Sequence, residues 1–288
     1  MTLVQAVALF LAAILAGALN SVAGGGSLIS FPTLLLVGVP AINANATNAM
    51  AVWPGSIASI PPYRKDLAHE RRELIFFSII SVVGGVLGAI VLLRTPPKVF
   101  ELLIPWLLLL ATLIFAFGGQ VTQRLRARRA ARAPTEAPAD ETAAQQTDDA
   151  GEPRAPSRAL VGVGVIQLAI AFYGGFFGGG MGIMMLAGFA LLGMRHIHAM
   201  NALKVVLASI INGVAVIAFT VAGKIFWPQA LVMVVGAVIG GYGGAALAHR
   251  VPARYVRWFA IAVGVAASAY LFYQQYYPYI QQVLQLPR

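Results

Sequence analysis

The sequence predicts an all-α polytopic membrane protein of two inverted repeats, each with about five helical segments and a broken or short helix at a Gly-rich position. Three observations predict this fold class. Hydrophobic residues fill 59% of the 288 positions and charged residues only 10%, whereas soluble domains carry about 25% charged residues. The first 63 residues hold no charged side chain, although about 20 apolar residues already span a bilayer as a helix. The two halves of the chain also repeat one ordered set of short motifs.

Ten apolar segments account for the predicted helices. Those of the first half cover about 3–21, 27–41, 44–61, 74–93 and 101–119. Those of the second half cover about 159–175, 181–194, 199–222, 227–248 and 255–273. The second segment of each half is short, because about fifteen residues reach only about 22 Å as a helix. Extended glycines before it, at about 3.3 Å each, would be enough to complete a crossing of about 30 Å.

The stretch 120–158 separates the two halves. It begins with several arginines and continues rich in Pro, Ala and acidic residues, without apolar periodicity. Such a composition buries too little apolar surface to offset the entropy lost on ordering, so we expect a disordered linker. The chain then divides into a first transmembrane repeat (1–119), the linker, a second transmembrane repeat (159–273) and a C-terminal tail (274–288).

The duplication is visible motif by motif. The segment Val82–Ala89 aligns without gaps with Val238–Ala245, and an Arg-x-Pro motif follows each of them. Glycines alone are common in membrane helices, but the same order of motifs in both halves indicates a duplicated unit. The other matched motifs are Gly24–Gly26 with Gly178–Gly180, Asn48-Ala49 with Asn201-Ala202, and Ser56 with Ser209.

The distribution of basic residues predicts a topology. With five crossings per half and the N-terminus outside, one side receives 15 of the 20 Lys and Arg and the other receives 4, and Lys204 lies inside a segment. The positive-inside rule then places the loop 62–73 and the linker 120–158 in the cytoplasm. An odd number of crossings inverts the second repeat, a common transporter plan. The alternative, eight transmembrane helices with two re-entrant segments, gives 13 against 6 and fits the rule less well.

The two glycine triplets are the first candidate for a substrate-binding site. Gly24, Gly25 and Gly26 precede one short helix, and Gly178, Gly179 and Gly180 precede the other. Glycine permits positive φ and close backbone approach. A helix that begins there directs its free N–H groups and positive dipole end between the halves, where two such ends can hold an anion. The alternative is that these glycines only allow tight helix crossings.

Polar side chains near the triplets are the second candidate. In hydrocarbon they should face a protein interior or a water-filled cavity, although Asn and Ser in membrane helices also serve simply as interhelical hydrogen-bond donors. Asn43 and Asn45 belong to this group because they follow the first short helix. The predicted substrate-binding side chains are Asn20, Ser21, Ser27, Thr47, Asn48, Tyr173, His198, Asn201 and Lys204.

Lys204 is the most informative of these residues. It lies about five residues into an apolar segment and has no acidic residue near it in sequence. An ammonium group at depth costs several kcal/mol unless it is paired or hydrated, so we expect a role in substrate binding or proton coupling. The alternative is that Lys204 snorkels to the nearby interface.

Several function classes find no support in the sequence. The chain contains no cysteine, which excludes disulfides, thiolate catalysis and Cys-based metal sites. The apolar segments hold no Ser-His-Asp set, His-x-x-x-His pair or acidic dyad, so we expect no enzyme activity, no cofactor and no metal. The net charge of +10 comes largely from loops that flank apolar runs, which indicates membrane topology rather than nucleic-acid binding.

These motifs resemble those of the TauE/SafE sulfite exporter family over nearly the whole chain except 120–158. The segments that carry the resemblance are Asn20–Pro32, Gly38-Val39-Pro40, Ala46-Thr47-Asn48, Gly178–Gly180 and Ile197–Lys204. The resemblance implies transport of sulfite, sulfonates or related sulfur-containing or organic anions across the bacterial inner membrane, coupled to ions or protons. It also implies about eight helices, fewer than the ten segments counted above.

The sequence therefore predicts a secondary transporter that moves a small anion by alternating access. The expected partners are the anion and the lipid bilayer. A proton or Na⁺ is the candidate coupling ion, and the sequence leaves open whether the protein forms a homo-oligomer. Two alternatives are a membrane scaffold that binds a partner through the linker or the tail, and a channel-like protein. A membrane-embedded enzyme acting on lipid is the least favoured reading.

Overall fold

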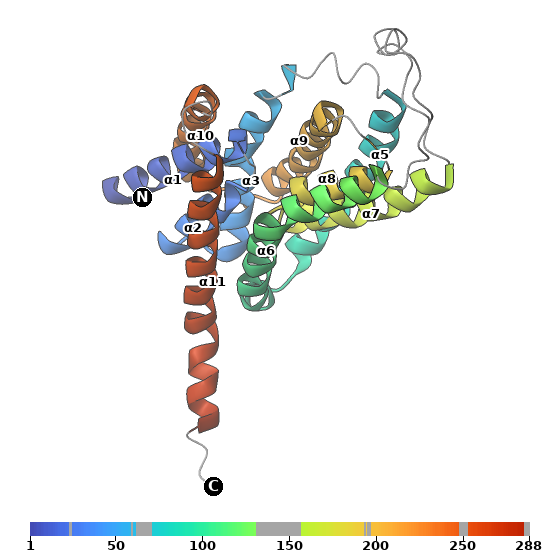
Figure 1. The fold of residues 1–288 in the computed structure, drawn as a ribbon. Helices are drawn as coiled ribbons and strands as arrows, with labels where there is room; N and C mark the ends of the chain where they lie inside the picture. The colour runs from blue at the N-terminus through green and yellow to red at the C-terminus, as the bar shows by residue number, and fades with distance from the viewer. Residues whose placement is uncertain are drawn as a thin grey trace, which may run out of the picture.

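The regular structure of the described residues is entirely helical, which confirms the predicted fold class (Figure 1). The computed structural model describes residues 1–22, 25–58, 60–61, 71–130, 157–192, 194, 197–247 and 253–284, and within these ranges there are ten α-helices and no strand. The first half forms α1 (Leu3–Val22), α2 (Ser27–Leu36), α3 (Ala41–Ala58), α5 (Arg71–Arg94) and α6 (Pro97–Ala130). The second half forms α7 (Ser157–Phe176), α8 (Met181–Leu192), α9 (Ile197–Val221), α10 (Trp227–Leu247) and α11 (Ala253–Leu284).

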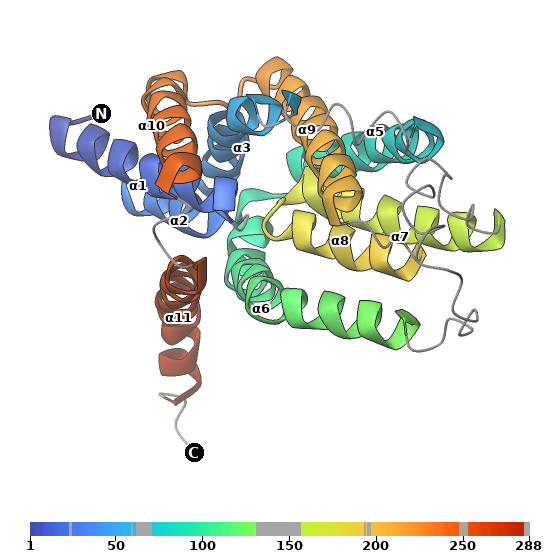
Figure 2. The same cartoon turned by 45° about the horizontal axis from the view of Figure 1, so that its top comes forward.

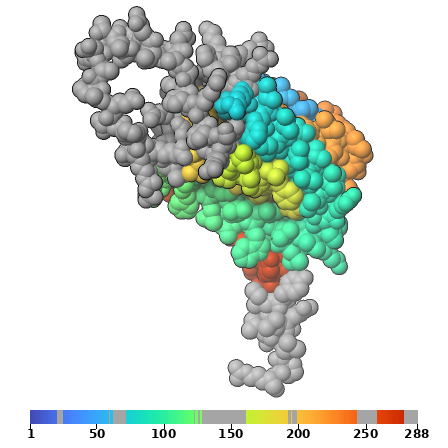
Figure 3. Space-filling view, turned by 90° about the vertical axis from the view of Figure 1, so that its right-hand side faces the viewer, coloured from blue at the N-terminus to red at the C-terminus, as the bar shows by residue number. Residues whose placement is uncertain are grey.

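Many of these helices suit a membrane rather than water. Among the described residues, α1, α5, α6 and α9 are long and apolar enough to cross a bilayer, and α2, α7, α8 and α10 contain shorter apolar stretches. Figure 3 shows the face that α5, α6 and α7 form together. Large apolar side chains are exposed on these helices, among them Ile79 on α5 and Val165 on α7. An exposed apolar surface of this kind is typical of contact with lipid.

One helix runs further than the apolar pattern predicted. Helix α6 continues to Ala130, so the first eleven residues of the range expected to be a disordered linker are helical. The reason is local, because Gln120–Ala130 consists largely of Arg, Ala, Leu and Gln, which are strong helix formers. Arginine near a helix C-terminus also interacts favourably with the helix dipole. The remainder of the predicted linker up to residue 156 lies outside the described residues.

The helices of the two halves are interleaved. The first helix of each half packs against the fourth helix of the other, α1 on α10 and α7 on α5. Figures 1 and 2 both show these two pairs at opposite ends of the bundle. In the same way α3 packs on α10 and α9 on α5, while α3 contacts its own counterpart α9 and α6 contacts its counterpart α11. The main helix pairings are therefore retained when the two halves are exchanged, as expected for a duplicated unit with two-fold pseudosymmetry.

Glycines from the repeated motif make this interleaving possible. A Cβ atom on Gly84 of α5 would lie 2.8 Å from the carbonyl oxygen of Leu168 on α7. Gly240 of α10 meets the carbonyl oxygen of Ile14 on α1 in the same manner. Gly84 corresponds to Gly240, and Leu168 corresponds to Ile14 in the register of the glycine triplets, so the two contacts are equivalent. Small residues that let helix backbones approach are the usual means of association in membranes.

The buried apolar side chains form two clusters. The larger joins α1, α2, α3, α6 and α10 around residues such as Phe31, Phe115 and Met233. The smaller joins α5, α7, α8 and α9 around Phe77 and Phe189. The half-buried ring of Tyr173 packs against both clusters, which places the end of α7 at their junction.

Candidate functional site

Both glycine triplets interrupt the helical chain. Helix α1 ends at Val22 and α2 begins at Ser27, while α7 ends at Phe176 and α8 begins at Met181. The φ angles of Gly25 and Gly178 are +90° and +82°, in the left-handed region that glycine adopts without steric cost. The predicted helix breaks are thus confirmed at both positions. Gly24 lies outside the described residues.

The two breaks meet at a single helix. A Cβ atom on Gly25 would lie 2.7 Å from the ring of Phe115, and one on Gly179 would lie 2.9 Å from the Cβ of Ala111. Ala111 and Phe115 are one turn apart on α6. The ring of Phe31 on α2 also packs edge-on against Phe177, with centroids 5.3 Å apart. Gly25 and Gly178 are 153 positions apart in sequence. The two breaks to which they belong nevertheless pack against the same part of α6.

Polar side chains stabilise the first break. The Oδ1 atom of Asn20 accepts a hydrogen bond from the backbone N–H of Gly26 at 2.8 Å. The hydroxyl of Ser30 donates to the carbonyl oxygen of Gly26 at 3.1 Å and also contacts Oδ1 of Asn48. Ser27 is the first residue of α2. Asn20 and Asn48, two of the predicted substrate-binding residues, therefore lie beside this break together with Ser30, which the sequence analysis had not selected.

A different set of groups stabilises the second break. The hydroxyl of Tyr173 donates a hydrogen bond to the carbonyl oxygen of Gly179 at 2.7 Å. The main-chain carbonyl oxygen of Tyr173 accepts hydrogen bonds from the N–H groups of Phe177 and Gly178. The Nδ2 atom of Asn45 on α3 donates to the carbonyl oxygen of Phe176 at 3.0 Å. Asn45 is 3% exposed, so the first half supplies a buried cap for the last residue of α7.

Lys204 lies across the first turn of α8. A Cβ atom on Gly182, the second residue of α8, would lie 3.4 Å from the Cδ atom of Lys204. The ammonium nitrogen of Lys204 donates to Oδ1 of Asn201, one turn earlier on α9, at 3.1 Å. Within the described part of the chain no carboxylate pairs with it. The aliphatic stem of Lys204 therefore packs against the first turn of α8, and its ammonium group bonds back to its own helix.

The remaining predicted residues divide into two groups. The hydroxyl of Thr47 accepts the N–H of Phe226 at 3.0 Å, and Asn43 donates to the carbonyl oxygen of Lys224 at 2.8 Å. Both side chains of α3 therefore hold the loop between α9 and α10. The side chains of Ser21 and His198 lie outside the described residues.

This arrangement defines an integral membrane protein of two interleaved repeats, each with a helix that breaks beside polar groups. The chain belongs to the sulfite exporter TauE/SafE family, whose model matches residues 9–271. A "Probable membrane transporter protein" of Haemophilus influenzae is 27% identical over 269 residues, covering 93% of this chain and 94% of the relative. The E. coli K12 protein YfcA, with a similar name, is 26% identical over 274 residues, covering 93% and 90%. No solved structure matches the chain.

A third relative extends the same picture. The "Probable membrane transporter protein ORF9" of Sinorhizobium sp is 26% identical over 272 residues, with 94% of this chain and 93% of the relative covered. These matches span both halves, so they include both helix breaks. The family and its relatives make the chain a membrane transporter rather than an enzyme.

Proposed function

We propose that this protein is a secondary transporter of a small anion, and that the anion binds at the first turn of α8 beside Lys204 and Asn201. The observation that carries the proposal is the position of the Lys204 side chain against Gly182. The side chain that carries the ammonium group packs by its stem against the N-terminal turn of a helix there. The predicted role of the second glycine triplet supports the same place.

Electrostatics favours an anion at this position. The N-terminus of a helix is equivalent to roughly half a positive charge, so a neighbouring ammonium group is repelled rather than stabilised by it. The Oδ1 atom of Asn201 supplies only a partial negative charge. An anion between them would interact favourably with the positive end of the helix dipole and with the ammonium group, which has three donors.

The two halves contribute unequally to this site. In the register that aligns Asn48 with Asn201, the counterpart of Lys204 is Ala51. Asn48 is instead engaged with Ser30, so its side-chain oxygen already has a partner within the first half. A single intramembrane cation suits one small anion with several acceptor oxygens. The family's name supports sulfite, a sulfonate or a related sulfur-containing or organic anion as that substrate.

Alternating access follows from the repeat architecture. The expected motion is rocking of one repeat against the other around the fixed site, with α3 and α9 as the directly contacting counterparts. We place the protein in the bacterial inner membrane with the loop 62–73 and the linker 120–158 in the cytoplasm, on the strength of the charge distribution. A proton or Na⁺ is the candidate coupling ion.

The test is anion flux in proteoliposomes that contain the purified full chain. Sulfite, a short sulfonate and a short carboxylate would be compared in the wild type, in Lys204→Met and in the control Lys224→Met. The described hydrogen bonds of Lys224 are made by its main chain, so its side chain is a matched cation outside the site. We expect saturable flux that Lys204→Met abolishes and Lys224→Met preserves. Wild-type flux in a correctly folded Lys204→Met protein would overturn the proposal.

A further inference from the structure

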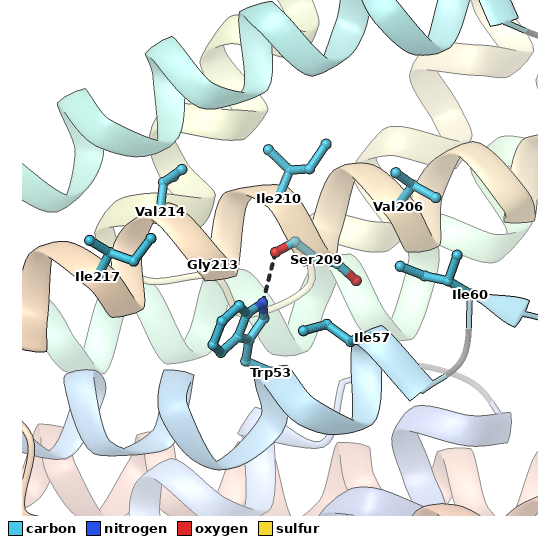
Figure 4. Close-up of a pocket in the computed structure, with 9 residues that line it drawn as sticks. All are labelled: Trp53, Ile57, Ile60, Val206, Ser209, Ile210, Gly213, Val214 and Ile217. Carbon is cyan, nitrogen blue, oxygen red and sulfur yellow. Dashed lines mark hydrogen bonds between the residues drawn. The ribbon is translucent and has the colours of Figure 1, made fainter.

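An apolar groove lies where α3 crosses α9 (Figure 4). We call it the crossing groove; its cavity volume is about 330 Å³. The groove is distinct from the glycine breaks and from Lys204, none of which lines it. Its lining residues are Trp53, Ile57, Ile60, Val206, Ser209, Ile210, Gly213, Val214 and Ile217.

The polar atoms in the crossing groove are already engaged. The indole nitrogen of Trp53 donates to the carbonyl oxygen of Ser209 at 3.0 Å, the bond drawn in Figure 4. The hydroxyl of Ser209 donates to the carbonyl oxygen of Val205 at 2.8 Å. The indole ring takes the space that a side chain at position 213 would fill, since a Cβ on Gly213 would lie 3.1 Å from it. A bound water needs two to four polar partners, so the lining favours an apolar occupant.

Equivalent positions of the two repeats line the crossing groove. Trp53 and Ile57 of α3, and Ile60 just beyond its end, correspond to Val206, Ile210 and Gly213 of α9 in the register that aligns Asn48 with Asn201. Each pair contributes both of its members to the lining. An occupant of the groove therefore contacts both repeats at equivalent positions.

The groove is open at its edges to the exposed apolar surface of the bundle. Ile57 and Ile217 are 43% and 61% exposed at its edges, and they continue the exposed apolar surface of the bundle. In a chain that belongs to a membrane transporter family, such a surface meets the acyl chains of the bilayer. An anionic substrate would lose its hydration here without gaining a donor, which is strongly unfavourable.

We propose that the crossing groove is a binding site for one acyl chain of a membrane phospholipid. A flexible aliphatic chain matches the apolar lining, the elongated line of contacts along α9 and the opening toward lipid. This site does not depend on the identity of the transported anion.

Trp53 provides a direct probe of occupancy. The full chain with Trp106, Trp227 and Trp258 changed to Phe would be reconstituted into phospholipid brominated at mid-chain, because bromine quenches indole fluorescence on contact. We expect quenching of Trp53 that is lost when Val206→Phe fills the groove. The control Val235→Phe, on an exposed position of α10, should leave the quenching unchanged. Absence of quenching in the parent protein, or equal quenching in both variants, would overturn the proposal.

A second measurement uses the wild-type chain and does not require tryptophan replacement. A phospholipid with a photoactivatable group at mid-chain would be incorporated, illuminated, and its adducts located by mass spectrometry. We expect adducts to concentrate on Ile57, Ile210 and Ile217. Adducts spread in proportion to exposure over positions such as Ile79 and Leu231 would overturn the proposal. So would cross-links between two copies of the chain through the groove, since the occupant would then be a second copy.

Discussion

Gly240 of α10 lies directly against the main-chain carbonyl oxygen of Ile14 on α1. The obstacle to any side chain at Gly240 is backbone rather than the end of a flexible side chain, so the two helices would have to separate. We expect Gly240→Ala to lower the free energy of unfolding by about 1–3 kcal/mol, the usual cost of overpacking. Thermal unfolding of the purified protein in detergent measures it.

A matched glycine tests whether that loss comes from the helix contact. Gly162 on α7 has no atom within 4 Å of the place where a Cβ would be, and alanine is the better helix former. We expect Gly162→Ala to leave the melting temperature unchanged or slightly raised. Equal destabilisation by Gly162→Ala and Gly240→Ala would show that the contact with Ile14 is not the cause.

Gly84→Ala extends the argument to the other half. Gly84 meets the carbonyl oxygen of Leu168, the equivalent contact between α5 and α7. If the two interfaces are built alike, Gly84→Ala should lower the melting temperature in the same direction as Gly240→Ala. The same unfolding assay decides this, and a neutral effect would mean that α7 adapts where α1 does not.

The sequence predicted the positions of the helices better than it predicted which helices pack against each other. Apolar runs bounded by charged loops define membrane segments because hydrocarbon excludes unpaired backbone and charge, so ten segments and both breaks were predictable. The end of α6 was not, since Gln120–Ala130 is helical by propensity although it is polar. The packing of α1 on α10 could not be predicted either, because a membrane helix is apolar on lipid-facing and protein-facing sides alike.

The candidate site was predictable to a similar degree. Lys204 and the glycine triplets stand out in one sequence because charge and φ freedom have specific costs in a membrane. Ser30 and Asn45 do not stand out, since one more serine or asparagine in a helix is also typical of a simple interhelical bond. Their contacts with Asn48 and Phe176 depend on how α2, α3 and α7 assemble.

Asn45 should support the second break. Asn45→Leu removes the donor to the carbonyl oxygen of Phe176 and leaves a buried acceptor without its partner, at an expected cost of about 1–3 kcal/mol. We also expect a raised KM for anion flux, because the end of α7 would lose its cap. Asn43→Leu is the control, since Asn43 bonds to the loop at Lys224 instead. An unchanged KM in Asn45→Leu would separate this residue from the site.

Tyr173 should hold the glycines that follow it. Tyr173→Phe removes the hydrogen bond to the carbonyl oxygen of Gly179 but retains the ring that packs on Phe177. The expected loss of stability is about 0.5–1.5 kcal/mol, with faster hydrogen exchange of the amides at the start of α8. Tyr270→Phe, at a residue that is 51% exposed, should not change that exchange. Identical exchange in the two variants would contradict the assignment.

Binding of the transported anion should stabilise the folded protein through Lys204. A ligand that binds only the folded state adds RT ln(1 + [L]/Kd), about 2.7 kcal/mol at one hundred times Kd. We expect the substrate anion to raise the melting temperature of the wild type and of Lys224→Met, and to have no effect on Lys204→Met. Chloride at equal ionic strength controls for screening, which acts on exposed charges wherever they lie. The proposed site at Gly182 depends on the side chain of Lys204. A shift in melting temperature that persists in Lys204→Met would therefore mean that the anion binds elsewhere.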